Sequence, residues 1–200
     1  MSETQPTVVV VEDEPDLADL YAAWLEDEYD VHPAYGGEDA LELVDELDDV
    51  DVVLLDRRMP DISGDEVLTA MEDREMDARV AMVTAVEPDF DIVAMGFDDY
   101  LVKPVAREAL EGTVSKLLLR DEYAVGVRDL FSLASKKALL EAEKSAAELD
   151  ESEEYAELSA QIESHRSRLD ETLDQLSEQS DLSELYRDLD IDDSASGDDD

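Results

Sequence analysis

Cysteine is absent from this chain of 200 residues. Its absence excludes a disulfide scaffold, a thiolate metal site and a cysteine nucleophile. The chain also lacks any apolar run near the roughly 20 residues that a membrane-spanning helix needs. Its first residues, MSETQPT, lack the basic and then apolar pattern of a secretion signal. We therefore expect no association with a membrane and a cytoplasmic location.

Basic residues are scarce, since 15 Lys and Arg stand against 58 Asp and Glu and give a formal net charge of -43. Such a surface repels the phosphates of nucleic acids, because binding by counterion release needs clustered Lys and Arg. The hydrophobic share of 44% is large enough for a buried core. The composition therefore predicts a folded, strongly acidic protein and disfavours direct binding to DNA.

An even acidic coat with little lysine is typical of proteins from salt-loving archaea, whose cytoplasm holds molar salt. At that ionic strength the Debye length is only about 3 Å, so repulsion among carboxylates is largely screened. We expect the fold to loosen in dilute buffer and to melt at a higher temperature in molar KCl. Thermal melts followed by circular dichroism in both buffers check this, and equal melting temperatures would contradict it.

The first 120 or so residues alternate short apolar runs with amphipathic stretches, as in a parallel sheet covered by helices. Ser63 and Glu66 have the spacing of a helix-capping box. Few residues separate Thr84 from Lys103, so the fourth helix of this half is expected to be short. The pattern predicts a doubly wound α/β domain, with five strands near residues 7–11, 29–35, 50–55, 79–83 and 99–102.

Beyond residue 121 no strand pattern remains, and apolar residues recur at helical spacing. We predict two helices hinged near Asp150, which form a hairpin or pair with another chain, and one more short helix at 182–189. His165 falls on the apolar stripe, where a polar residue that sets helix register is favoured over a phosphotransfer histidine. The predicted domains are 1–120, a helical domain at 121–191 and a disordered acidic tail at 192–200.

Residues that can carry chemistry gather where the predicted strands end. Glu12 and Asp13 follow the first strand, Asp56 follows the third, and Thr84 and Lys103 lie at the ends of the fourth and fifth. In an open α/β sheet these ends form the ligand crevice. Carboxylates this close repel, and each must be neutralised by a proton or a cation. Because only oxygen ligands are available, Mg²⁺ is the cation that fits best. The same edge suits a phosphoryl group that a carboxylate attacks while cations hold its oxygens.

Four segments, in this order, make the chain resemble the receiver domains of two-component response regulators. They are VVVVEDEPDL at 8–17, VVLLDRRMPDISG at 52–64, VTA at 83–85 and GFDDYLVKP at 96–104. The resemblance implies a flavodoxin-like fold whose five parallel strands have the order 2-1-3-4-5. It also implies a signalling protein that catalyses its own phosphorylation and is not a turnover enzyme.

The resemblance assigns roles to individual residues. Asp56 matches the phosphoacceptor, which takes a phosphoryl group from a sensor histidine kinase. Thr84 matches the switch hydroxyl, Tyr100 the switch aromatic and Lys103 the phosphate-binding lysine, which a cis bond to Pro104 would aim. Glu12 stands where Asp is commonest, so the metal geometry there can differ. The implied Mg²⁺ ligands are Glu12, Asp13, Asp56 and the backbone carbonyl of Arg58.

Residues from about 121 to 191 resemble the HalX domain that follows receivers in halophilic archaea. The resemblance rests on DLFSLASKKALLEAEKS and on the long helix after it. A net charge of -18 over the last 80 residues, together with the apolar stripes, favours a module for dimerisation or protein docking. A homodimer through the receiver face or these helices is expected, and a DNA-binding transcriptional regulator is the alternative.

Two further functions stand beside the response-regulator interpretation. A constitutive scaffold would carry a receiver that is never phosphorylated. A hydrolytic enzyme is disfavoured, because the chain offers neither a Ser–His pairing nor a cluster of metal-ligating histidines.

Overall fold

The computed structural model describes residues 5–47 and 49–193. The chain divides into two compact units, residues 1–118 and 119–200. The tail that we expect to be disordered lies outside the described residues from 194 onward. Among the helices described, none is long and apolar enough to cross a membrane.

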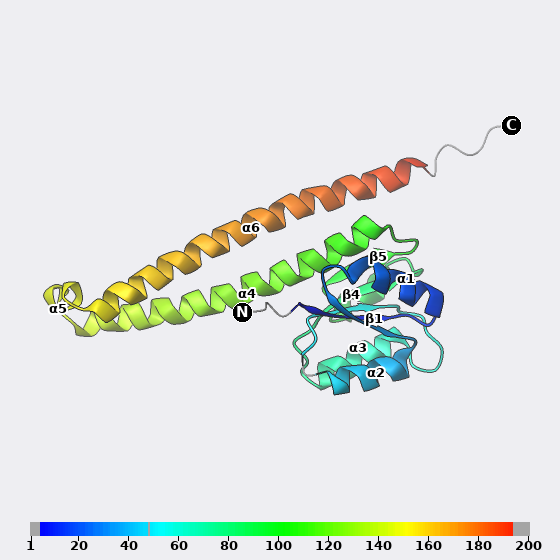
Figure 1. The fold of residues 1–200 in the computed structure, drawn as a ribbon, viewed down its shortest axis with the longest axis horizontal. Coiled ribbons are helices and arrows are strands. Elements are labelled where there is room, and N and C mark those ends of the chain that lie inside the picture. The colour runs from blue at the N-terminus through cyan, green and yellow to red at the C-terminus, as the bar shows by residue number, and fades with distance from the viewer. Residues whose placement is uncertain (1–4, 48, 194–200) are drawn as a thin grey trace. The chain divides into compact units, whose positions relative to one another are not determined.

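The first unit is built on one parallel sheet, which confirms the predicted fold class (Figure 1). The strand order is β2-β1-β3-β4-β5. The chain therefore adds β2 on one side of β1 and then adds β3, β4 and β5 on the other side. All carboxyl ends lie at one edge, because every neighbouring pair is parallel. The strands are β1 (Thr7–Val11), β2 (Asp30–Ala34), β3 (Val52–Leu55), β4 (Arg79–Thr84) and β5 (Asp99–Val102).

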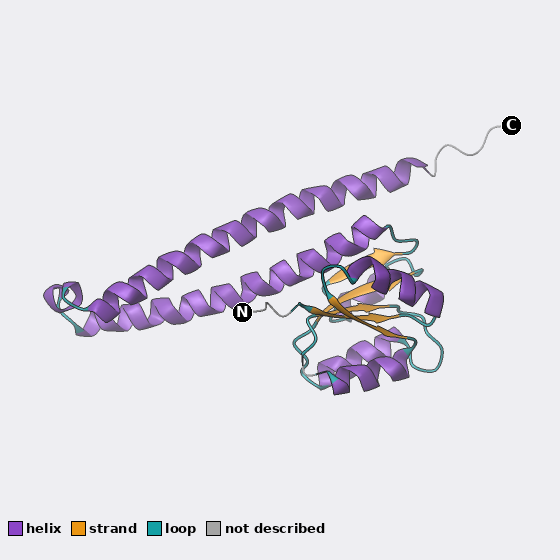
Figure 2. Cartoon of the chain, in the orientation of Figure 1, coloured by secondary structure: helices purple, strands orange, loops and turns teal. Residues whose placement is uncertain are grey.

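Helices cover both faces of the sheet (Figure 2). The predicted capping box is present: the Ser63 hydroxyl accepts a hydrogen bond from the Glu66 N–H, and the Glu66 carboxylate accepts one from the Ser63 N–H. The fourth helix is reduced to η1 (Phe90–Ala94), one stretch of 3₁₀-helix. The α-helices of this unit are α1 (Pro15–Leu25), α2 (Gly37–Glu46), α3 (Gly64–Asp73) and the start of α4 (Arg107–Glu143).

The second unit is helical, as predicted. Helix α4 continues through residue 121 without a break, so the predicted boundary at 120/121 lies inside a helix. A turn with the short helix α5 (Ala146–Asp150) leads to α6 (Glu153–Asp193), close to the hinge predicted at Asp150. The prediction of a separate helix at 182–189 was wrong, because α6 runs on to Asp193. The residues of α6 include neither Pro nor Gly to end the helix earlier.

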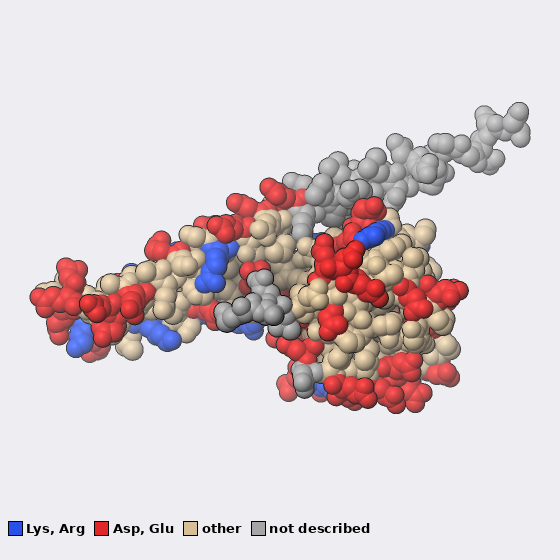
Figure 3. Space-filling view, viewed as in Figure 1, with Lys and Arg blue, Asp and Glu red and all other residues tan. Residues whose placement is uncertain are grey.

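Acidic side chains are spread over the visible face of both units, with basic ones in a few isolated places (Figure 3). Within the first unit several basic side chains are taken up by carboxylates. Arg74 pairs with Asp45 at 3.0 Å, and Lys116 pairs with Asp99 at 3.1 Å. The surface therefore keeps a large negative charge that local ion pairs only partly offset.

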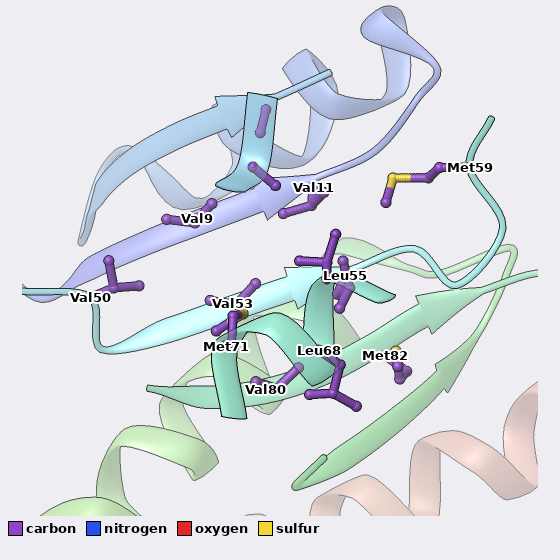
Figure 4. Packing of buried hydrophobic residues seen from close by; sticks show 13 residues of the cluster. Val9, Val11, Val50, Val53, Leu55, Met59, Leu68, Met71, Val80 and Met82 are labelled. Atoms are coloured by element: carbon purple, nitrogen blue, oxygen red, sulfur yellow. The ribbon is translucent and has the colours of Figure 1, made fainter. Parts of the chain in front are cut away.

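The sheet separates two apolar cores, because successive side chains of a strand point to opposite faces. Val9, Val53 and Val80 face α2 and α3, where Leu68 and Met71 pack on them (Figure 4). On the other face the adjoining strand residues pack against α1 and the first part of α4. Trp24 of α1 packs on this second core, with its ring centroid 5.4 Å from that of Tyr21.

Candidate functional site

Asp56 lies directly after β3, whose four residues are all buried. Its backbone N–H donates to the Val11 carbonyl at 2.9 Å, so the sheet pairing holds this residue at the end of the strand. The residue is only 6% exposed. The Arg58 N–H donates to Asp56 Oδ1 at 3.0 Å and fixes one carboxylate oxygen. The backbone thus presents a carboxylate in a set orientation at the carboxyl edge of the sheet.

Glu12 and Asp13 approach Asp56 from the end of β1. The Glu12 N–H donates to the Ala34 carbonyl at 3.0 Å, which extends the pairing of β1 with β2. The Glu12 side chain is 2% exposed. One oxygen from each of the three carboxylates lies within 4.8 Å of the others. The structure therefore brings together the three acidic side chains that the sequence placed at this edge.

Lys103 supplies the positive charge at this cluster. Its Nζ donates to Asp56 Oδ2 at 2.6 Å and to Glu12 Oε2 at 2.5 Å. Burial alone would lower the pKa of Lys103, but the bonds to Asp56 and Glu12 outweigh it and raise that pKa. For Glu12, burial outweighs the bond to Lys103 and raises the pKa of its carboxyl. One ammonium therefore faces three carboxyl groups, and their repulsion is only partly compensated.

The residues present fit a hard divalent cation. Glu12 Oε1 is buried and has no hydrogen-bond partner among the described residues. An unsatisfied buried carboxylate oxygen is costly, and a cation would satisfy it. The donors are all oxygens, which Mg²⁺ prefers. The cluster of Glu12, Asp13 and Asp56 could therefore hold Mg²⁺.

Thr84 and Tyr100 are linked through the backbone of Val86. Thr84 is fully buried at the end of β4, and its carbonyl accepts from the Lys103 N–H at 2.9 Å. The Thr84 hydroxyl oxygen accepts from the Val86 N–H at 3.4 Å. The Tyr100 hydroxyl donates to the Val86 carbonyl at 2.7 Å. The Lys103–Pro104 peptide bond is cis, as expected.

The pattern of the sequence and the geometry of this pocket agree with the comparison to known families. Residues 8–115 match the response regulator receiver domain, and residues 119–186 match the HalX domain. This chain is a response regulator. It consists of a receiver followed by a HalX domain.

Relatives of this response regulator differ in how much they share with it. A Haloferax volcanii protein named "Putative transcriptional regulator" is 46% identical over 191 residues, which is 93% of this chain and 32% of that protein. Response regulator SaeR of Staphylococcus epidermidis is 32% identical over 117 residues, or 56% of this chain and 50% of SaeR. The aligned part of the chain thus spans 32% of the length of the Haloferax protein and 50% of the length of SaeR.

Solved structures resemble the receiver part of the chain. Response regulator protein TrrA of Thermotoga maritima, in complex with Mg²⁺–BeF, is 34% identical with a TM-score of 0.51, covering 56% of this chain and 99% of its own. The receiver domain of the Francisella response regulator 1452 is 27% identical with a TM-score of 0.54, and the match covers 58% of this chain and 98% of that domain's chain. Both support the receiver fold for the first unit.

Gly64 belongs to the receiver site, although the sequence pattern indicates only the start of a helix at this residue. A Cβ at Gly64 would lie 2.2 Å from the Asp56 carbonyl oxygen and 2.9 Å from Arg57 Cα. The Gly64 N–H donates to the Arg57 carbonyl at 3.0 Å, which holds the two backbones together. Only glycine fits there. The one available signal was a glycine at the first turn of a capped helix, where a glycine is not otherwise favoured.

A cavity of about 540 Å³ opens beside the segment that follows Asp56. It lies between the loops after β3 and β4, so the residues after Asp56 and those after Thr84 form its two sides. Its lining residues are Arg57, Arg58, Met59, Ser63, Asp65, Val86, Glu87 and Asp89.

Proposed function

We propose that Asp56 of this response regulator accepts a phosphoryl group from a sensor histidine kinase. The observation that carries the proposal is the position of its carboxylate, 2.6 Å from Lys103 Nζ and beside Glu12 and Asp13. A carboxylate attacking phosphorus needs nearby cations to hold the phosphoryl oxygens. The open cavity next to residues 57 and 58 offers a side from which the phosphodonor can approach.

In the reaction, an Asp56 oxygen forms a new bond to phosphorus while the N–P bond of the kinase phosphohistidine breaks. The electron pair of that bond stays on the imidazole. Glu12, Asp13, Asp56 and the Arg58 carbonyl would hold Mg²⁺, which when bound neutralises the charge that develops on the phosphoryl oxygens. Lys103 contributes a second cation, and its bond to Glu12 Oε2 keeps the ammonium beside Asp56.

The new phosphoryl group then biases a two-state equilibrium. We expect the Thr84 hydroxyl to leave the Val86 N–H and donate to a phosphoryl oxygen. Because Val86 also accepts the hydrogen bond of Tyr100, a change at Thr84 reaches the aromatic ring directly. Tyr100 therefore acts as the switch aromatic in this proposal.

The output is proposed to be protein docking or dimerisation by the helical unit, with no turnover reaction of its own. The alternative, a DNA-binding regulator, is disfavoured by the net charge of -43. The name of the Haloferax protein does not favour it, since this chain covers only 32% of that protein. A shift of promoter DNA on a gel in molar KCl would contradict the docking assignment.

Replacing Asp56 with asparagine is expected to abolish phosphorylation, because an amide is a poor nucleophile. The measurement is incorporation of labelled phosphate from acetyl phosphate with Mg²⁺ in molar KCl. Asp61→Asn is the matched control: Asp61 is exposed, lies in the same loop and has φ 63°, which asparagine tolerates. We expect near-stoichiometric incorporation in the wild type and the control. Equal incorporation in Asp56→Asn would overturn the proposal.

A further inference from the structure

The contacts within the second unit identify the side of α4 that faces α6. The Lys137 ammonium lies 5.5 Å from the centre of the Tyr155 ring, and the Tyr155 hydroxyl donates to Glu141 at 2.6 Å. Nearer the start of the helix, an added Cβ at Gly126 would meet Leu169 Cδ2 at 2.8 Å. Positions 126, 137 and 141 of α4 therefore face α6.

A second stripe of side chains lies on the opposite side of α4. At 100° per residue, Ser135 lies roughly 120–180° around the helix from positions 126, 137 and 141. Two large apolar side chains near Ser135 are left in water, since Phe131 is 74% exposed and Leu139 is 66% exposed. We call the six residues within about 40° of Ser135 the outer stripe. They are Ala124, Arg128, Phe131, Ser135, Leu139 and Ala142.

Negative charge is locally low around the outer stripe. Residues 130–140 are the longest stretch of this sequence without Asp or Glu. The two cations in this stretch, Lys136 and Lys137, lie about 100° and 160° around the helix from Ser135 and so outside the stripe. Two copies of a chain of net charge -43 repel each other, and the repulsion is weakest where acidic side chains are missing. The outer stripe is therefore a place where a second copy can approach closely.

The outer stripe is self-complementary about Ser135. Phe131 lies four residues before it and Leu139 four residues after it, while Arg128 lies seven before and Glu143 eight after. The side chains of Arg128 and Glu143 are exposed and have no ion pair or hydrogen bond with any described residue. The Ser135 hydroxyl donates to the Phe131 carbonyl at 2.8 Å, so its donor is satisfied within the helix. A two-fold axis at Ser135 would therefore bring apolar groups together and opposite charges together.

We propose that the outer stripe packs against the outer stripe of a second copy of this chain. The two α4 helices run antiparallel, with Ser135 at the two-fold axis. Phe131 of each copy packs beside Leu139 of the other, and the Arg128 guanidinium pairs with the Glu143 carboxylate of the other. Because α6 lies on the far side of its own α4, both hairpins stay intact. The inference rests on the docking role proposed above for the helical unit and does not depend on phosphorylation of the receiver.

Single cysteines can test this geometry, because the chain has none of its own. Helices packed about 9 Å apart, with Cα atoms about 2.3 Å from each axis, place the two facing Cα atoms at position 135 about 4–5 Å apart. This separation is at the short end of the range for a disulfide. We expect Ser135→Cys, oxidised with copper phenanthroline in molar KCl, to run mainly as a linked dimer on a non-reducing gel.

Ser132→Cys is the matched control for cross-linking. Ser132 is also an exposed serine of α4. In the antiparallel pair its two copies lie about 9 Å apart along the helices, since each is three residues from the axis. This variant should therefore remain almost entirely unlinked under the same oxidation.

Light scattering of the full chain in molar KCl, across a range of concentrations, tests the apolar contact. The wild type should be a dimer that dissociates on dilution. Phe131→Glu should weaken the dimer by at least about 30-fold, as expected for an aromatic anchor. Phe90→Glu is the matched control, because Phe90 is also an exposed phenylalanine, at 92%, but lies in η1 of the receiver. It should leave the dimer unchanged.

Exchange of the two charges tests the ion pair. Arg128→Glu or Glu143→Arg alone places like charges together at two symmetric points and should weaken the dimer about tenfold. The double variant with both changes restores opposite charges and should recover most of the wild-type affinity. The measurement is made at the lowest KCl concentration at which the circular dichroism of the wild type keeps its molar-salt value, because salt screens the pair.

Several outcomes would overturn the proposal. One is a wild type that stays monomeric at every concentration. Others are a dimer that survives Phe131→Glu or dissociates with Phe90→Glu, and no more cross-linking at position 135 than at position 132. A double charge variant as weak as the single ones would exclude the antiparallel pairing. Phosphate incorporation should be unchanged in all these variants, so failure here leaves the assignment of Asp56 intact.

Discussion

Replacing Gly64 with alanine is expected to slow phosphorylation of Asp56 by about 100-fold, although Gly64 carries no reactive group. The added methyl would lie 2.2 Å from the Asp56 carbonyl oxygen and 2.9 Å from Arg57 Cα. Both are backbone atoms that cannot rotate away, so the loop after β3 must shift. A displacement of about 1 Å at a reacting group is enough for such a loss of rate. The initial rate of phosphate incorporation from acetyl phosphate measures it.

The matched control is Gly112→Ala. Gly112 lies inside α4, and an added Cβ there meets nothing within 4 Å. Alanine is favoured over glycine in a helix interior by about 1 kcal/mol, so this variant should be more stable and phosphorylate at the wild-type rate. For Gly64→Ala we expect a loss of about 1–3 kcal/mol of unfolding free energy, as for other overpacked positions. A wild-type rate in Gly64→Ala would show that the loop is not held by this contact.

Asp13→Asn is expected to stabilise the metal-free protein and to remove its response to Mg²⁺. Three carboxylates lie within 4.8 Å of one another, and the Lys103 ammonium pairs with two of them, Glu12 and Asp56, so removal of the charge on Asp13 relieves repulsion. We expect a gain of about 1–2 kcal/mol in unfolding free energy without Mg²⁺. The wild type should instead gain about 2.7 kcal/mol when Mg²⁺ is present at 100 times its dissociation constant.

The order of stability should therefore reverse between the two conditions. Calorimetric melts in molar KCl, with EDTA or with Mg²⁺, measure both states. Asp61→Asn again serves as the control, since it removes an exposed carboxylate outside the cluster and should follow the wild type in both buffers. If Asp13→Asn melts below the wild type in EDTA, repulsion among these carboxylates is not the dominant cost.

The sheet and the acidic pocket could be predicted from the sequence because both depend on strong local patterns. Buried parallel strands are short apolar runs, and β3 is apolar at every position before Asp56. An acidic residue directly after such a run is held at the sheet edge, where water and ligands reach it. The placement of Glu12, Asp13, Asp56 and Lys103 follows from strand ends alone.

Other features depend on contacts that no local pattern carries. The close approach of Gly64 to Asp56 arises from two backbone segments that meet only in the fold. The link through Val86 is made by backbone atoms, so the residue type gives no sign of it. The sequence predicted a domain boundary at 120/121 but did not show that a single helix, α4, runs across it, because a change of domain does not require a change in secondary structure. Residues 113–125 contain neither Pro nor Gly to end the helix.

Trp24 is the chain's single tryptophan, and it packs on the core between the sheet, α1 and the start of α4. Its fluorescence will therefore follow denaturation of the receiver, while the far-ultraviolet signal will be weighted toward the long helices α4 and α6. One unlabelled sample thus contains two optical probes. Their midpoints in a urea titration will reveal whether the halves of the polypeptide melt as one cooperative block or in separate steps.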